Sequence, residues 1–227
     1  MNQTKGHSNS IDFEIVALAA IFLLFVYSLL QHHFIFPEHW FPGQFTALVF
    51  TLIFCIWILS EIANNAWSKK NAIAANKDKG SFKVIVAMVW LAILAVFAFR
   101  SFDVGTFSGI TQYVGLCIFV AGIVLREWAV IVLGKHFNVR VQVHEKARLV
   151  MEGPYHYIRH PAYTGTLLIF IGIGLSIGTW LGAIVALAIA WIAHGYRIRI
   201  EEVALREAFG ADFEVYKRRT WKLFPGF

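Results

Sequence analysis

Long apolar stretches separated by short polar segments make up most of this chain. A helix needs roughly 20 apolar residues to cross a bilayer. Runs of about that length occupy residues 15–36, 43–64, 83–100, 109–133, 162–178 and 180–200. The pattern therefore predicts an all-α, polytopic membrane protein with about six membrane-embedded helical segments. We expect residues 1–227 to form a single membrane domain.

The last two apolar runs predict a tight helical hairpin. Gly178, Thr179 and Trp180 separate them. Small residues that allow close helix packing lie along both runs, namely Gly165, Gly172, Gly174 and Gly182. Residues 201–219 are polar with a helical period, so we expect a separate surface helix after the hairpin, on the cytoplasmic side.

The composition agrees with a membrane protein. The chain is 58% hydrophobic and only 15% charged, whereas soluble domains carry about 25% charged residues. Cys55 and Cys117 both lie inside apolar runs, so we expect neither a disulfide framework nor a metal site.

Basic residues gather in alternate polar segments and predict the topology. Lys and Arg are frequent in residues 66–83, 134–160 and 206–222, and they are absent from residues 37–42 and 101–108. By the positive-inside rule, the basic segments and both termini face the cytoplasm. The net charge of +6 is then an orientation signal, and no nucleic acid is expected as a partner. We expect a multi-pass protein of the plasma (inner) membrane with a site that faces the cytoplasm.

Two polar clusters flank the predicted hairpin on this basic side. The first is the loop MEGPYHYIRHPAYTG at 151–165, in which Pro154 and Pro161 interrupt helices. The second contains His194, Arg197 and Glu201, which share one helix face at i, i+3 and i+7. We expect the two clusters to converge in a pocket at the membrane edge. The alternative is an interfacial belt of aromatic and basic residues with local ion pairs.

Arg126 and Glu127 form a separate polar pair within the fourth apolar run. Two possibilities are open on the sequence: structural pairing or snorkelling of these side chains, and a role in the pocket.

Three motifs together carry a family resemblance. LGKHF at 133–137, GPYHYIRHPAYTG at 153–165 and EEVALREAFGADFEVYKRRT at 201–220 resemble the isoprenylcysteine carboxyl methyltransferase family. The resemblance implies a multi-span helical membrane enzyme that binds S-adenosylmethionine without a Rossmann domain. It also implies a division into N-terminal spanning helices, residues 15–133, and a cofactor-binding catalytic region, residues 134–227.

The resemblance also implies roles for individual residues. Arg197 matches the position that engages the substrate carboxylate. The cofactor-contacting positions match Gln142, Leu149, Val150, Tyr155, His160, Pro161, Ala162, Tyr163 and Glu201. The segment between Gln142 and Leu149 is shorter than in eukaryotic members.

The expected function is transfer of a methyl group from S-adenosylmethionine to a lipophilic acceptor, with the carboxylate of a prenylcysteine-like substrate as the leading candidate. The expected partners are this lipophilic or prenylated substrate and membrane lipids. A thiol, an amine or a phospholipid headgroup is an alternative acceptor, and would call for a general base such as His156, His160 or His194. A non-catalytic membrane scaffold and an NADPH-dependent sterol- or enoyl-reductase-like enzyme are also open on the sequence. Thr166 stands where such reductases commonly have Asp.

Overall fold

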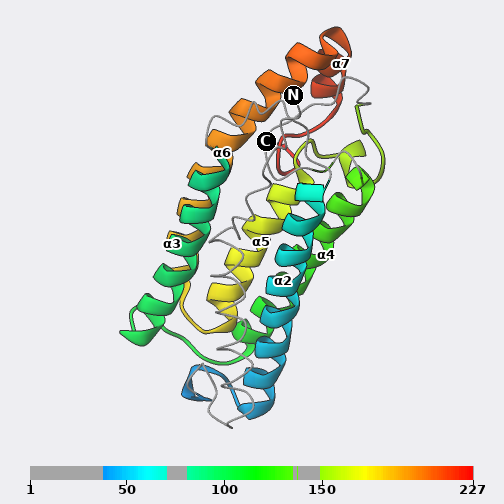
Figure 1. Ribbon diagram of the computed structural model, residues 1–227. Coiled ribbons are helices and arrows are strands. Elements are labelled where there is room, and N and C mark those ends of the chain that lie inside the picture. Colours follow the sequence, from blue (N-terminus) through cyan, green and yellow to red (C-terminus); the bar gives the residue numbers. More distant parts are fainter. Residues whose placement is uncertain (1–37, 71–80, 135–136, 138–148, 227) are drawn as a thin grey trace, which may run out of the picture.

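The structure, a computed structural model, describes residues 38–70, 81–134, 137 and 149–226. The described chain is helical, with two isolated β-bridges and no strand in these ranges. Its elements are η1 (Glu38–Trp40), α2 (Gln44–Lys70), α3 (Ser81–Ser101), α4 (Ile110–Leu133), η3 (Gly153–His156), α5 (Pro161–Ser176), α6 (Trp180–Phe209) and α7 (Ala211–Arg219). The long helices run along one another (Figure 1), which confirms the predicted all-α class. The predicted span 15–36 and Gln142 lie outside the described residues.

Four of the described helices, α2, α3, α4 and α6, are long and apolar enough to cross a membrane. Helix α5 is apolar but has only 16 residues, which corresponds to roughly 24 Å at 1.5 Å per residue. That is shorter than the roughly 30 Å hydrocarbon core of a bilayer. Five of the six predicted membrane-embedded segments are therefore present as helices, and α5 is the short one.

Glycine allows α5 to lie very close to α4. A Cβ atom on Gly122 would lie 2.7 Å from the backbone nitrogen of Ile169, and one on Gly165 would lie 2.7 Å from the carbonyl oxygen of Gly122. Gly172 faces the backbone of Phe119 in the same way. The sequence suggests that these glycines serve the α5–α6 hairpin, but in the structure Gly165 and Gly172 serve the contact with α4.

The α5–α6 hairpin is present as predicted. Its turn contains Gly178, whose φ of +80° is readily adopted only by glycine. Thr179 caps α6, because its side-chain oxygen accepts a hydrogen bond of 3.1 Å from the backbone nitrogen of Gly182. Gly174 then packs against Ala183 of α6.

The separate helix predicted over residues 201–219 is wrong in its boundaries. Helix α6 continues without a break to Phe209, and α7 begins after Gly210, which has a φ of +50°. Residues 201–209 are rich in Glu, Ala, Leu and Arg, which are strong helix formers. The change from apolar to polar residues at Glu201 thus marks a change of surroundings along one helix, and not its end.

A polar cluster lies at the hairpin turn and is buried except for Asp103. We call its residues, Arg100, Asp103, Gln112 and Thr179, the turn cluster. Arg100 donates from Nε to the carbonyl of Ile177 at 2.8 Å and from Nη1 to Asp103 Oδ1 at 2.5 Å. Gln112 Nε2 donates to the carbonyls of Trp40 at 2.6 Å and Ser176 at 3.0 Å. These bonds tie η1 and α3–α5 together at this end.

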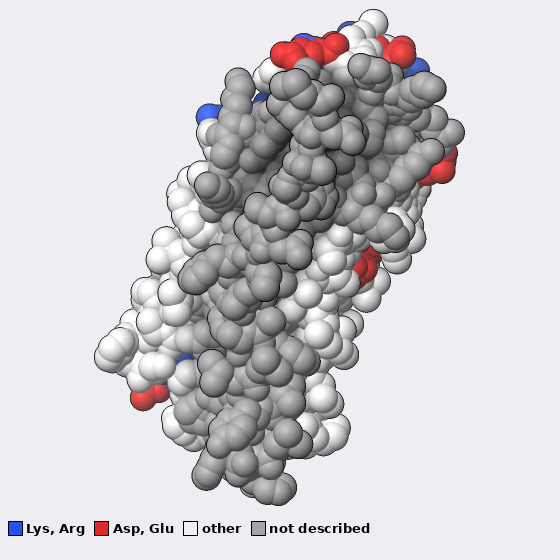
Figure 2. Space-filling view, viewed as in Figure 1, with Lys and Arg blue, Asp and Glu red and all other residues white. Residues whose placement is uncertain are grey.

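Charged side chains are concentrated at the ends of the molecule. Figure 2 shows most of the Lys, Arg, Asp and Glu residues of this face at the end that carries α7, with a smaller group at the opposite end. The flanks visible between them are mostly uncharged. Arg206 of α6 pairs with Glu214 of α7 at 2.7 Å and helps to hold α7 in place.

Candidate active site

The loop that leads into α5 pairs with the segment after α7. Arg159 donates its backbone N–H to the carbonyl of Trp221 at 2.8 Å, and Trp221 donates to the carbonyl of Tyr157 at 3.0 Å. His160 donates to the carbonyl of Lys222 at 3.2 Å. Residues 157–160 are therefore fixed by backbone hydrogen bonds to residues far along the chain.

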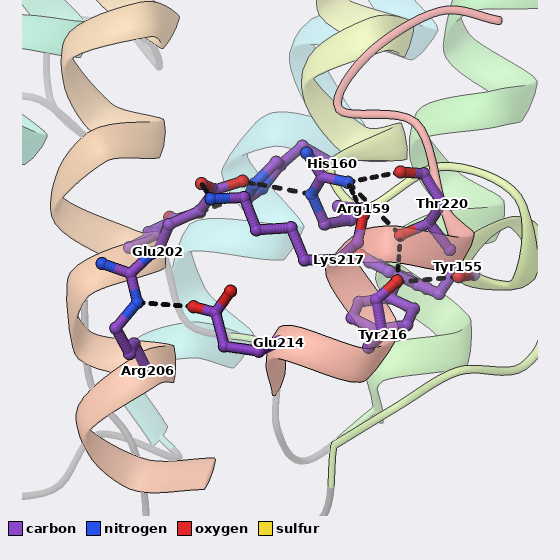
Figure 3. A network of polar contacts seen from close by, with 10 residues as sticks. Tyr155, Arg159, His160, Glu202, Arg206, Glu214, Tyr216, Lys217 and Thr220 are labelled. Atoms are coloured by element: carbon purple, nitrogen blue, oxygen red, sulfur yellow. Dashed lines mark hydrogen bonds and ion pairs between the residues drawn. The ribbon is translucent and has the colours of Figure 1, made fainter. Parts of the chain in front are cut away.

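Arg159 strengthens this pairing through its side chain. Its Nη1 donates to the carbonyl oxygens of Lys217, at 2.9 Å, and Thr220. Its Nε pairs with Glu202 of α6 at 3.1 Å, and Lys217 Nζ approaches the same carboxylate at 3.8 Å. Figure 3 shows these side chains gathered between α6, α7 and the loop. The guanidinium of Arg159 thus joins three separate parts of the chain.

The carboxylate of Glu201 is the centre of a second group of contacts, on the face of α6 that includes Arg197. Arg197 Nε donates to Glu201 Oε1 at 2.9 Å and lies 3.2 Å from the hydroxyl of Tyr163. The Tyr163 hydroxyl donates to the same carboxylate oxygen. The Arg197 side chain is only 3% exposed, whereas that of Glu201 is 22% exposed. The group is therefore largely buried, with the carboxylate as its more accessible member.

His160 connects the two groups. Its Nδ1 lies 3.6 Å from Glu201 Oε2, and its Nε2 lies 3.4 Å from Glu202 Oε1. Burial alone would lower the pKa of His160, but the hydrogen bonds to Glu201 and Glu202 outweigh it and raise the pKa above the ordinary value. Glu202 is rotated by about 100° from Glu201 on the helix, yet both carboxylates reach this imidazole.

Two aromatic contacts extend the site along α6. The Tyr163 ring stacks on His160 with ring centroids 5.8 Å apart, and on His194 with centroids 4.7 Å apart. His194 is 3% exposed, and neither ring nitrogen has a hydrogen-bond partner. The predicted face of His194, Arg197 and Glu201 does meet the loop, through Tyr163 and His160.

The remaining residues of the predicted site lie around this centre. Tyr155 in η3 is buried, and the Tyr216 hydroxyl donates to its carbonyl at 2.8 Å. Burial, and after it the negative charge of Glu201, raise the pKa of the Tyr155 phenol well above its usual value, so it stays neutral. Pro161 is buried at the start of α5, and the half-buried residues of the predicted set are Leu149, Val150 and Ala162.

Several residues that hold this site are not among those predicted from the sequence. Arg159 and Glu202 have no individual role among the predicted site residues, although both lie next to predicted ones. The contacts from α7 and beyond it, at Tyr216, Lys217 and Thr220, have no signal in the spacing of the motifs. Within the described ranges, no group of His, Cys, Asp and Glu residues is arranged to hold a metal ion.

Arg126 and Glu127 pair with α2. Arg126 Nη2 lies 2.6 Å from Glu61 Oε2, and its Nη1 lies 3.3 Å from the hydroxyl of Thr166. Glu127 accepts a hydrogen bond of 3.0 Å from Asn64 Nδ2. Of the two possibilities left open by the sequence, structural pairing is the one that these contacts support.

Known proteins are similar to this region in sequence, and one solved structure is similar to the chain in fold. The sequence profile of the isoprenylcysteine carboxyl methyltransferase family matches residues 114–207. Protein-S-isoprenylcysteine O-methyltransferase B of Arabidopsis thaliana is 31% identical over 121 residues, which is 50% of this chain and 61% of that protein. The probable protein-S-isoprenylcysteine O-methyltransferase of Oryza sativa subsp. japonica is 30% identical over 116 residues, with the same two shares.

A solved structure extends the likeness to nearly the whole chain. The eukaryotic intramembrane Ras methyltransferase, an isoprenylcysteine carboxyl methyltransferase, superimposes with a TM-score of 0.60 at 20% identity. The match covers 94% of this chain and 75% of that one, so the two share a fold. In sequence, the chain spans about three-fifths of the length of the plant relatives. Residues 114–207 of this chain are thus similar in sequence to the isoprenylcysteine carboxyl methyltransferase family.

Proposed function

We propose that this protein is a membrane O-methyltransferase that uses S-adenosylmethionine to methylate the carboxylate of a lipophilic, prenylcysteine-like acceptor. The observation that carries the proposal is the buried group of Arg197, Glu201 and Tyr163, in which a guanidinium and a carboxylate are held side by side. Both charged residues lie inside the matched family segment, and the names of the plant relatives specify O-methylation of isoprenylcysteine.

The side chains around Glu201 fit the cofactor. A sulfonium is a cation, and cations are stabilised by carboxylates and by the faces of aromatic rings. Glu201 supplies the first, and Tyr155 and Tyr163 supply the second. The bound cofactor would contribute an electrophilic methyl group. The chain's own task is to hold the charges: Arg197, Tyr163 and His160 fix the orientation of the Glu201 carboxylate.

The acceptor side of the proposal rests on Arg197. A carboxylate is already ionised at neutral pH, so it needs orientation and no general base. A guanidinium holds a carboxylate through two parallel hydrogen bonds, and in a buried site such contacts are stronger than in water. Holding the acceptor oxygen in line with the methyl group is the main catalytic requirement of such a displacement.

His160 is poorly suited to be the general base that an amine or thiol acceptor would need. Either would require a base to remove a proton. His160 lies between two carboxylates that raise its pKa and so favour its protonated form. A protonated imidazole cannot accept a further proton.

The proposed orientation places the site on the cytoplasmic face of the plasma (inner) membrane. The support is the basic segments that the sequence places on one side, together with the charged end of the molecule that carries α7 (Figure 2). Cysteine labelling tests the orientation: a residue introduced at Arg218 should react only after the membrane is made permeable. Labelling of this cysteine from the outside of intact cells would mean that the proposed orientation is reversed.

Calorimetry tests the cofactor directly. Purified protein in detergent should bind S-adenosylmethionine and should not bind NADPH. Methylation of a prenylcysteine analogue, measured beside an amine-headgroup lipid, then identifies the acceptor. Binding of NADPH alone would favour a reductase, and binding of neither ligand would favour a scaffold. Methylation of the amine-headgroup lipid alone would contradict the proposal that the acceptor is a carboxylate.

A further inference from the structure

His194 is an unusual residue for the inside of a helical membrane protein. It is 3% exposed, and both ring nitrogens are buried without a hydrogen-bond partner. Burying a polar group without a partner costs free energy, and most buried polar atoms in folded proteins are paired. An imidazole kept in this state next to a candidate active site therefore points to a partner that arrives with a ligand.

The position of His194 limits what that ligand group can be. Residues 180–193 of α6, from its start to the residue before His194, have only apolar side chains or glycine. Arg197 follows three residues later, about 4.5 Å along the helix axis. Tyr163 lies against both, because its ring stacks on His194 and its hydroxyl lies 3.2 Å from Arg197 Nε. His194 thus stands between the charged centre and the apolar half of α6.

A lipophilic carboxylate bound at Arg197 would extend its tail along that apolar half and pass His194. In a prenylcysteine-like acceptor, the group between the carboxylate and the lipid tail carries an amide. A neutral imidazole offers one N–H donor and one acceptor nitrogen, and an amide offers the matching N–H and C=O. A charged imidazole in this place would be buried without a hydrogen-bonded counter-ion, because neither ring nitrogen has a partner. The neutral form of His194 is therefore the stable one.

We infer that His194 binds the methyl acceptor by hydrogen bonding to the amide next to its carboxylate, and so selects acceptors that carry this amide. The inference rests on the proposed function and adds to it a residue that determines specificity. A site built to hydrogen-bond a polar group discriminates against ligands that lack the group, because its own buried polar atoms are then left unpaired.

Two acceptors and three variants test the inference. The acceptors are N-acetyl-S-farnesylcysteine and 3-(farnesylthio)propionate, which has the carboxylate and the lipid but no amide. His194→Phe keeps a ring to stack on Tyr163 and removes both nitrogens. His194→Gln keeps hydrogen-bonding atoms. Leu52→Phe, at a residue of α2 that is 49% exposed, is the matched control. Binding is measured by calorimetry in detergent, and methyl transfer is measured separately.

The wild type and Leu52→Phe should bind the amide-bearing acceptor about 10-fold more tightly than the other acceptor. His194→Phe should lose this preference, keep its affinity for S-adenosylmethionine, and melt at or above the wild-type temperature because two unpaired buried nitrogens are gone. His194→Gln should recover part of the preference.

Three results would overturn the inference: a preference that survives His194→Phe, a loss of cofactor affinity in that variant, or a wild type that binds the two acceptors equally. Discrimination in binding without any methyl transfer would instead overturn the proposed function and leave the role of His194 standing. Normal methyl transfer without discrimination between the two acceptors would overturn the role of His194 and leave the proposed function standing.

Discussion

The turn cluster and the candidate active site lie at opposite ends of α5, and they are built in different ways. In the turn cluster, the buried donors end mainly on backbone carbonyls: Arg100 reaches those of Ile177 and His39, and Gln112 reaches those of Trp40 and Ser176. At the candidate site, Glu201 is held by other side chains, namely those of Arg197, Tyr163 and His160.

The difference in hydrogen-bond partners indicates a structural role for the turn cluster and a ligand-binding role for the candidate site. A donor that satisfies a backbone carbonyl cannot leave without exposing an unpaired group of the fold itself. A carboxylate held by side chains can exchange one partner for a ligand by a change of rotamer. His194, whose nitrogens have no partner, is the extreme case at the site. We therefore expect changes in the turn cluster to lower stability, and changes at the site to lower binding or turnover.

The largest effect is expected for Arg197→Lys. The variant keeps the positive charge and loses the planar fork that orients a carboxylate. Turnover of the prenylcysteine analogue should fall roughly 30- to 1000-fold, or about 2–4 kcal/mol, with little change in cofactor affinity. Arg100→Lys is the matched control in the turn cluster, and should lower the melting temperature without changing the turnover of the folded protein. Equal effects on turnover would remove the distinction between the clusters.

Glu201→Gln and Glu202→Gln sharpen the comparison within the site. Glu201→Gln should weaken S-adenosylmethionine binding by about 1.5–3 kcal/mol, as expected for the loss of a charged contact. Glu202→Gln should leave the affinity much closer to that of the wild type and lower the melting temperature, because Glu202 pairs with Arg159 and Lys217. Calorimetry and thermal unfolding distinguish the two. If both variants lost the same affinity, Glu202 would share the cofactor site.

Gln112→Leu tests the turn cluster itself. The change leaves the carbonyls of Trp40 and Ser176 without their donor, and should cost about 1–3 kcal/mol of unfolding free energy. The neighbouring change Thr111→Leu, at an exposed position of α4, should have little effect. Thermal unfolding in detergent measures both. A Gln112→Leu protein of normal stability and reduced turnover would contradict a purely structural role for the turn cluster.

The smallest expected effect is a dependence of stability on pH. The pKa of His160 is raised in the folded protein, so its contribution is complete below the ordinary histidine value of about 6.5. The contribution is lost as the pH rises through the raised pKa, and each tenfold gain in proton affinity on folding is worth about 1.4 kcal/mol. The melting temperature of the wild type should therefore fall over this range more steeply than that of His160→Gln. Parallel curves would mean that the two carboxylates do not hold a protonated imidazole.

The sequence predicted the helices well, because long apolar runs and their glycine-containing breaks are local features. It also brought His194, Arg197 and Glu201 to one face, since helical spacing determines this without tertiary information. It did not predict that Arg159 would bind the carbonyls of Lys217 and Thr220. Pairing between two irregular segments has no periodicity, and it depends on where α7 turns back.

The glycines illustrate the same limit. Gly165 and Gly172 indicated a close helix contact, and a close contact exists, but the partner is α4. A small residue shows that another backbone approaches, whereas the identity of that backbone is set by the whole packing.

The unbroken course of α6 has a mechanical consequence. Its 30 residues correspond to roughly 45 Å, against a hydrocarbon core of roughly 30 Å. One rigid rod thus carries an apolar surface at one end and Arg197, Glu201 and Glu202 toward the other. Helices adjust to bilayer thickness by tilting, and a tilt of α6 relative to the loop at 157–160 would move all three charged side chains together. We therefore expect the thickness of the surrounding membrane, and with it the lipid composition, to affect the geometry of the site.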